Sequence, residues 1–239
     1  MKAMIFAAGL GTRLGDLSKE RPKALVDING KTALRIAAEK LVTGGFDELM
    51  VNIHHHPDLM TEEIERLRKD GFKISVSDER EQLLDTGGGL YKAREFFHDA
   101  PFICYNVDIF TDLPLRELYG SHMASGALAT LAVRHRPGKR LLLTDKKGRL
   151  RGWCNNETHE EILTVESRKG LTEVGFSAIQ VISPEIFRLM PDGIYSIISL
   201  MLMLAGENFV NTFPYDGGYW FDCGTPQNLE KIRKYLSHI

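Results

Sequence analysis

Apolar residues recur along the chain in short runs at 2–8, 48–53, 73–77, 101–106, 127–133 and 174–182. Each run has the length of a strand, and helical patterns of about 10–15 residues separate the early ones. Strands that alternate with helices are typical of βαβ units, so the pattern predicts an α/β fold around a mainly parallel sheet. From about residue 127 the strands are shorter and turns are more frequent, which predicts an added antiparallel portion.

The first helical pattern follows Thr32, the expected N-cap, and stops at Gly44-Gly45. Its expected inward face consists of Leu34, Ala37, Ala38, Leu41 and Val42.

A second helix is expected from Pro57 to Gly71, with Ile64 and Leu67 pointing inward. Its charged residues are expected to point outward: Glu62, Glu63, Glu65, Arg66, Arg68 and Lys69. A later segment, 196–209, is apolar almost all round, which fits a buried helix or a dimer interface. The last helix is expected to begin at Thr225 as N-cap, with Pro226 in its first turn.

Composition leaves this picture unchanged but narrows the partners. The 239 residues are 43% hydrophobic and 26% charged with a formal net charge of −2, so bulk charge favours neither nucleic acid nor an anionic membrane. No segment approaches the length of a membrane span, and no linker or repeat divides residues 1–239, so one domain is expected. The three cysteines, Cys104, Cys154 and Cys223, form no CxxC motif, which fits a cytoplasmic protein without a disulfide framework.

Candidate chemistry concentrates in residues 4–26, "MIFAAGLGTRLGDLSKERPKALV". Glycines at positions 9, 11 and 15 match neither the dinucleotide fingerprint nor a Walker loop. A strand that ends in a glycine turn still exposes N–H groups that can bind phosphate oxygens. The cations that follow, Arg13, Lys19, Arg21 and Lys23, favour a triphosphate over the alternative of a tight turn before a solvated basic loop.

The string "AAGLGTRL", followed by "RPKAL", resembles the signature of the sugar-1-phosphate nucleotidyltransferases. The resemblance extends along the chain through "LLDTGGGL" (83–90), "NVDIFTD" (106–112), "GFSAIQVISPEIF" (175–187) and "WFDCGTPQNL" (220–229). Within that family, the TGGG form is similar to the N-acetylmuramate-1-phosphate uridylyltransferases.

The resemblance implies a three-layer αβα, Rossmann-like (GT-A-like) nucleotidyltransferase fold. Its nucleotide-binding half would span about 1–125 and its sugar-phosphate-binding half about 126–239. The implied enzyme joins a nucleoside triphosphate and a sugar 1-phosphate, giving a nucleotide sugar and pyrophosphate, and is a possible homo-oligomer. We therefore expect the substrate to be a UTP and amino-sugar phosphate pair, such as UTP with N-acetylmuramate 1-phosphate.

The resemblance also implies roles for charged residues. Arg13 would bind the leaving phosphates, and Lys23 would bridge the α-phosphate and the nucleophile. Asp108 and Asp222 would hold Mg²⁺, for which Mn²⁺ could substitute, because two carboxylates and a triphosphate supply the hard oxygen ligands that such ions prefer. Taken singly, an aspartate at a strand end is more often a turn or cap residue.

The remaining implied contacts belong to nucleotide and sugar. The glycine turn would bind nucleotide through Ala8, Gly9, Gly11 and Thr12, together with Asn106. The base would lie against a loop at Gln82, Thr86, Gly87 and Gly88, because glycine lets a planar ring approach the backbone. Gly175 and Glu166 would bind the sugar.

Three features leave alternatives open. Val107 stands where the family usually has glycine before the metal-binding aspartate, so altered sugar choice or impaired activity is expected. Other substrate pairs are mannose 1-phosphate with GTP and phosphocholine with CTP, and a non-catalytic nucleotide-binding regulatory subunit is the alternative outside enzymes. Finally, "NIHHHPD" at 52–58 places three consecutive histidines at a strand end, where they point in different directions and fit a metal poorly.

Overall fold

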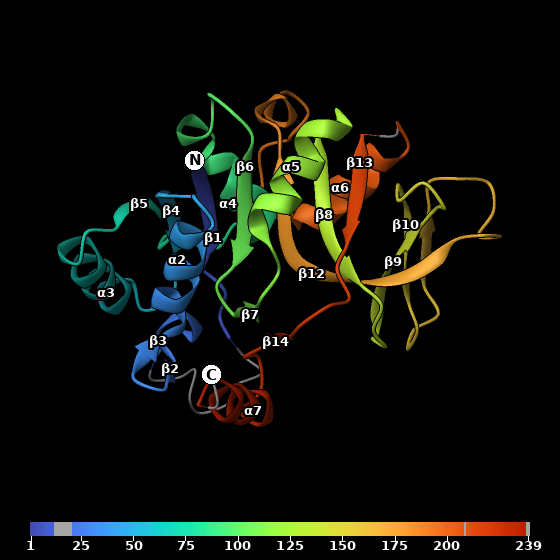
Figure 1. The fold of residues 1–239 in the computed structure, drawn as a ribbon. Helices are drawn as coiled ribbons and strands as arrows, with labels where there is room; N and C mark the ends of the chain where they lie inside the picture. The colour runs from blue at the N-terminus through green and yellow to red at the C-terminus, as the bar shows by residue number, and fades with distance from the viewer. Residues whose placement is uncertain (12–20, 208, 238–239) are drawn as a thin grey trace.

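A ten-stranded sheet lies between two layers of helices in the computed structural model, which describes residues 1–11, 21–207 and 209–237 (Figure 1). Four strands of its N-terminal half run parallel in the spatial order β6-β1-β4-β5, as the βαβ pattern predicts. Their bounds are β1 Lys2–Phe6, β4 Glu48–Ile53, β5 Lys73–Asp78 and β6 Phe102–Asn106.

Both faces of this sheet are buried. On β1, Ala3 and Ile5 join the apolar core on one face, whereas Met4 and Phe6 join the core on the other. The first face is covered by α2 (Ala33–Thr43), α3 (Pro57–Lys69) and α5 (Leu115–Ser125), and the second by α4 (Asp85–Lys92) and α6 (Ile197–Ala205). The fold is therefore the three-layer α/β arrangement that the sequence predicts.

The antiparallel portion is built on the long strand β12 (Thr172–Ile182), which pairs with β6, β8 and β9. Its register shifts between Phe176 and Gln180, where Ala178 adopts a left-handed conformation with φ 59°. Such a bulge bends the strand, so β12 pairs with β6 at one end and with β9 at the other. The other strands here are β8 Ala129–Arg134, β9 Arg140–Thr144, β10 Leu150–Asn155, β11 Glu161–Leu163 and β13 Val210–Pro214.

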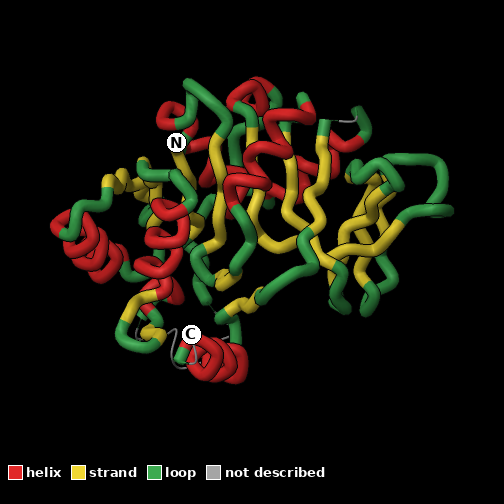
Figure 2. The backbone as a smooth tube through the Cα atoms, in the orientation of Figure 1, coloured by secondary structure: helices red, strands yellow, loops and turns green. Residues whose placement is uncertain are grey.

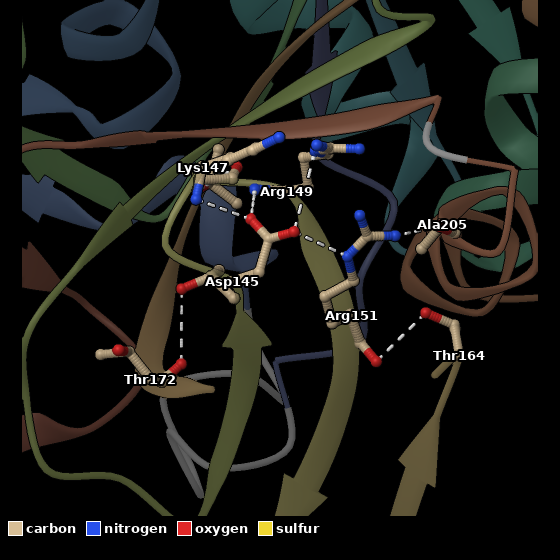
Figure 3. Close-up of polar contacts among 10 residues, drawn as sticks. Asp145, Lys147, Arg149, Arg151, Thr164, Thr172 and Ala205 are labelled. Carbon is tan, nitrogen blue, oxygen red and sulfur yellow. Dashed lines mark hydrogen bonds and ion pairs between the residues drawn. The ribbon is translucent and has the colours of Figure 1, made fainter. Parts of the chain in front are cut away.

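A cluster around Asp145 fixes the turn between β9 and β10 (Figure 3). The Asp145 carboxylate accepts hydrogen bonds from the backbone N–H groups of Lys147 (2.8 Å) and Arg149 (3.0 Å) and from Arg151 Nε (2.9 Å). Arg151 also donates to the carbonyl of Ala205 at the end of α6 (3.5 Å). Opposite charges therefore hold the hairpin together, and the hydrogen bond from Arg151 to the Ala205 carbonyl connects it to the helix layer.

The chain returns to its N-terminal half near its end. Strand β14 (Trp220–Asp222) pairs with β7 (Ile109–Thr111), and α7 (Pro226–Leu236) follows it below the sheet (Figure 2). Arg233 on α7 donates to the carbonyl of Asp27 (2.7 Å). Asp27 belongs to a small hairpin of β2 (Asp27–Ile28) and β3 (Lys31–Thr32). This hairpin follows the 3-10 turn η2 (Lys23–Leu25). Two further 3-10 turns are η3 (Arg94–Phe96) and η4 (Pro184–Arg188).

Helix boundaries agree closely with the predictions, and Thr32 and Thr225 are N-caps that accept from Arg35 N (3.1 Å) and Asn228 N (3.2 Å). Two predicted orientations are wrong. Val42 is 39% exposed, because it lies at the rim of a shallow surface groove and not against the sheet. Glu63 is buried at 7% exposure, because its carboxylate accepts a hydrogen bond from the Thr32 hydroxyl (2.7 Å).

The apolar segment 196–209 contains α6, whose residues mostly pack into the core, as expected of a buried helix. The exposed residues of this helix are Ser199 and Met203, of which Met203 is 59% exposed. Within the described ranges, no helix combines the length and apolar character that a membrane crossing requires.

Candidate active site

The carboxyl ends of β1 and β6 open into a cavity of about 460 Å³. Because these strands are parallel neighbours, the residues that follow each of them meet at the same edge of the sheet. Seven residues predicted from the sequence line this cavity, which we call the phosphate cavity: Ala8, Gly9, Gly11, Lys23, Thr86, Asn106 and Asp108. Thr12 and Arg13 lie outside the described residues.

A buried polar network holds the turn after β1. The Asn52 side-chain oxygen accepts from the N–H groups of Ala7 (2.7 Å) and Ala8 (3.3 Å), and its amide donates to Glu79 Oε1 (2.7 Å). The other Glu79 oxygen accepts from Leu84 N (3.1 Å). Burial raises the pKa of Glu79, although these hydrogen bonds oppose that shift. The network therefore links the floor of the cavity to the loop that precedes α4.

Lys23 and Asp108 form an ion pair inside the phosphate cavity. Pro22 precedes the one-turn helix that carries Lys23, and Asp108 follows β6 directly. The two side chains are 12% and 15% exposed. At this depth both charges lose part of their hydration, and their pairing compensates part of that cost.

Asp222 comes from the far end of the sequence to the segment that follows β6, but it is not among the residues that line the phosphate cavity, whereas Gly224 is. In the β14–β7 pair Asp222 lies opposite Ile109, and the N–H of the next residue, Cys223, donates to the carbonyl of Asp108 (2.9 Å). Gly224 N donates to Asp222 Oδ1 (2.9 Å), which fixes the carboxylate. The paired strands thus place the backbone of residues 222–223 beside that of residues 108–109, and the sharing of one ion by the two carboxylates stays a prediction.

Two carboxylates with no third metal-binding side chain are a sparse ligand set. Across the described ranges, no group of three histidine, cysteine or acidic residues is arranged to hold a metal. The donor chemistry nevertheless fits a hard divalent cation that takes its remaining oxygens from water and a phosphate ligand.

The TGGG segment differs from the expected loop. It forms the start of α4, and the open space expected beside Gly87 and Gly88 is occupied by protein atoms. A side chain at Gly87 would collide with the ring of Tyr195, and one at Gly88 would collide with the Gly193 carbonyl. The side of each glycine that a Cβ would occupy therefore packs against residues 193–195, and contact between a base and the backbone of this segment stays a prediction.

Thr86 remains at the cavity wall, and its hydroxyl accepts from Ile197 N (2.9 Å). Gln82, in contrast, is exposed, and its backbone N–H donates to the Glu79 carbonyl (3.0 Å).

The two residues predicted to bind the sugar lie in different environments. Gly175 lies on β12 against the guanidinium of Arg136, whereas Glu166 is exposed in the loop after β11. Val107 lines the phosphate cavity, is buried in the core, and is not among the residues with a left-handed backbone. The backbone at this position therefore does not require glycine, and the valine narrows the cavity with its side chain.

The three histidines occupy different environments at the end of β4. His54 Nδ1 lies 2.7 Å from the Glu79 carbonyl, an arrangement in which the nitrogen donates. His55 and His56 contact one another, with ring centroids 4.0 Å apart.

Sequence analysis missed Asn52 and Ile194 as lining residues of the phosphate cavity. Asn52 had a visible signal, because it is a polar residue inside the apolar strand 48–53. Ile194 had none, since its position over the cavity depends on the packing of residues 193–195 against α4.

Residues 2–140 match the family described as nucleotidyl transferase. The chain belongs to this family. The resemblance to sugar-1-phosphate nucleotidyltransferases is confirmed, and with it the prediction that the protein is an enzyme.

Individual relatives within this nucleotidyl transferase family differ in name. The N-acetylmuramate alpha-1-phosphate uridylyltransferase of Caulobacter vibrioides is 28% identical over 94% of this chain and 92% of its own length. The mannose-1-phosphate guanylyltransferase catalytic subunit beta of Dictyostelium discoideum is 36% identical over 100% of this chain, and the match covers 66% of the Dictyostelium protein. Among solved structures, HddC from Yersinia pseudotuberculosis has a TM-score of 0.79 at 20% identity, covering 98% of this chain and 99% of that one, which supports the fold.

Proposed function

We propose that this enzyme transfers a uridylyl group from UTP to N-acetylmuramate 1-phosphate and releases pyrophosphate. The observation that carries the proposal is the Lys23–Asp108 pair at the bottom of a cavity whose wall is the glycine turn after β1. A relative that bears this activity in its name matches nearly the full length of both chains.

The chemistry asks for positioning and charge, not for a covalent intermediate. An oxygen of the sugar phosphate forms a bond to the α-phosphorus, and the bond from that phosphorus to the bridging oxygen breaks. The electron pair leaves with pyrophosphate. Since a sugar phosphate is mostly dianionic at neutral pH, the attacking oxygen needs no protein base. No histidine is therefore expected to be essential.

Each charged residue has a proposed part in this step. Lys23 would exchange its contact with Asp108 for one with the α-phosphate and the attacking phosphate. Arg13 would bind the β- and γ-phosphates. Asp108 and Asp222 would hold Mg²⁺ or Mn²⁺, which supplies positive charge beside the α-phosphate when bound.

A second candidate is guanylyl transfer to mannose 1-phosphate, which the 36% identity to the Dictyostelium relative favours. The test is a matrix of four nucleoside triphosphates against N-acetylmuramate, N-acetylglucosamine, glucose and mannose 1-phosphates and phosphocholine, with pyrophosphate release as the readout. UTP with N-acetylmuramate 1-phosphate should give the highest kcat/KM. A maximum at GTP with mannose 1-phosphate or CTP with phosphocholine would replace this assignment, and nucleotide binding without turnover in every pair would indicate a regulatory subunit.

A further inference from the structure

A second cavity, also of about 460 Å³, lies beside strands β9, β10 and β12 at the start of α6. Its wall is largely apolar and includes Trp153, Phe176 and Leu202. Two cations, Arg136 and Arg140, also line it, as does Ser196 at the N-cap of α6. We call it the arginine cavity. Cationic groups on an apolar wall suit a ligand that combines a short carbon chain with a negative charge.

Arg136 is the half-buried cation of this wall, whereas Arg140 is exposed. Its guanidinium carbon lies 4.7 Å from the centre of the Trp220 ring, and its Nη2 donates to the Phe176 carbonyl (3.2 Å). Its Nε is buried without a hydrogen-bond partner, and in the described part of the chain no carboxylate pairs with the guanidinium. Burial lowers the pKa of Arg136, with the charge of Asp222 opposing the shift, but a guanidinium stays protonated in proteins.

A half-buried guanidinium with a buried Nε that lacks a partner costs free energy, and an anionic ligand can recover part of it. The exposed Arg168, by comparison, already pairs with both Glu161 and Glu173. Arg136 therefore differs from Arg168 in having a positive charge that is available to bind an anionic ligand.

The position of Arg136 connects this cavity to the reaction site. Trp220, on which it stacks, lies two positions before Asp222 on β14 and is itself fixed by a hydrogen bond to the Ser177 carbonyl (3.0 Å). On the other side, a Cβ at Gly175 would lie 2.5 Å from Arg136 Nε, so the guanidinium can occupy this position only because residue 175 is glycine. Gly175 is the residue that the family resemblance places beside the sugar.

We propose that Arg136 binds a carboxylate carried by the sugar of the sugar 1-phosphate, while the apolar wall contacts the carbon chain that bears it. This inference rests on the proposed function. N-acetylmuramate 1-phosphate has such a group, a lactyl ether, and N-acetylglucosamine 1-phosphate is the same sugar phosphate without it. Arginine suits the role because its planar fork matches a carboxylate. Arg136 is then a specificity-determining residue.

The experiment compares these two sugar phosphates with UTP in the wild-type enzyme and in Arg136→Met, Arg136→Lys and Arg134→Met. Arg134→Met is the matched control, because it removes an equal charge two positions away and outside the cavity lining. Arg136→Met should lower kcat/KM for N-acetylmuramate 1-phosphate by roughly 10–100-fold, the usual effect of losing a hydrogen bond to a charged group. It should change the value for N-acetylglucosamine 1-phosphate by less than about threefold, and Arg136→Lys should recover part of the loss.

A substrate-side test covers the case in which Arg136→Met does not fold. The wild-type enzyme should lose a similar factor when the lactyl carboxylate is converted to its methyl ester. Equal loss on both sugar phosphates in folded Arg136→Met, or equal use of acid and ester by the wild-type enzyme, overturns this inference but leaves nucleotidyl transfer intact. Absence of pyrophosphate release with every substrate pair would instead overturn the proposed function.

Discussion

The two cavities have the same volume, about 460 Å³, but different structural elements form their walls. The phosphate cavity lies at the ends of two parallel strands and includes the glycine turn, and a buried network from Asn52 and Glu79 supports it. The arginine cavity is walled by side chains from three antiparallel strands and a helix. Main-chain N–H groups serve any triphosphate alike, whereas side chains distinguish one ligand from another. We therefore expect changes at the first cavity to affect every substrate equally, and changes at the second to affect only some.

The largest effect should come from Asp108 and Asp222. Under the proposed function both carboxylates hold the same ion, so Asp108→Asn and Asp222→Asn should each reduce turnover by roughly 10³-fold or more with all sugar phosphates. A chelator should abolish pyrophosphate release, and Mg²⁺ or Mn²⁺ should restore it.

The double variant provides the stricter measurement. It should lose much less than the product of the single losses, since groups that serve one ion act as a unit. Asp99→Asn, an exposed partner of Lys2, is the control. Independent, multiplying losses would show that the two aspartates do not share an ion.

Lys23→Ala should lower turnover by roughly 10²–10³-fold, the typical cost of losing one contact to charge that develops in the transition state. The matched control is Lys31→Ala, whose lysine is exposed and paired with Glu39. The loss should be the same for N-acetylmuramate and N-acetylglucosamine 1-phosphates. A substrate-dependent loss would contradict the separation between the two cavities, and near-normal turnover would remove Lys23 from the reaction.

A third prediction concerns pH and the stability of the C-terminal half. His122 on α5 lies 3.0 Å from Thr130 Oγ1 and 2.9 Å from Ser183 Oγ, and burial lowers its pKa to about 4. A pKa below the unfolded value of 6.5 favours the neutral ring in the folded state. This contribution is therefore complete above pH 6.5 and is lost as pH falls from 6.5 to 4, by up to about 3 kcal/mol.

His122→Gln isolates that effect, because the carboxylates that titrate in the same range are common to both proteins. The free energy of unfolding, measured by urea at several pH values, should fall less steeply with acid in the variant. Parallel pH profiles for the two proteins would exclude His122 as the source.

The smallest expected effect comes from replacing glycines, and it should differ between a glycine packed against backbone, Gly88, and a glycine with open space beside it, Gly9. Gly88→Ala should destabilise the fold by about 1–3 kcal/mol, because its new methyl group meets the backbone carbonyl of Gly193, which cannot rotate away. Gly9→Ala should leave the fold unchanged, since a Cβ at Gly9 has no neighbour within 4 Å among the described residues. It should instead weaken triphosphate binding, which calorimetry would detect. The reverse pattern would contradict the positions of both glycines.

Most of the phosphate cavity was predictable because its parts leave local signals in the sequence. The strand at 2–8, the glycines after it, Lys23 after a proline and Asp108 after a buried strand are each visible in a short window. The approach of the Asp222 segment to the end of β6 was available only from the family resemblance, since no local pattern says that β14 pairs with β7.

The arginine cavity was not predictable for the same physical reason. Arg136 and Trp220 are 84 positions apart (220 − 136), and nothing in either neighbourhood records their stacking. Similarly, the burial of Glu63 depends on its hydrogen bond with the hydroxyl of Thr32, the N-cap of α2. The packing beside Gly87 depends on the ring of Tyr195. Contacts of this kind are decided by tertiary packing, not by sequence periodicity.

The pairing of β14 with β7 has a consequence for biosynthesis. A protein leaves the ribosome from its N-terminus, and its early parts fold first. The glycine turn, Lys23 and Asp108 are therefore synthesised long before Asp222. Strand β7 can pair with β14 only after residues 220–222 have been synthesised. A nascent or prematurely terminated chain that lacks β14 would contain most of the phosphate cavity but would lack Asp222. Under the proposed function such a fragment would bind nucleotide without consuming it, so catalytic competence would arise only after β14 has been made.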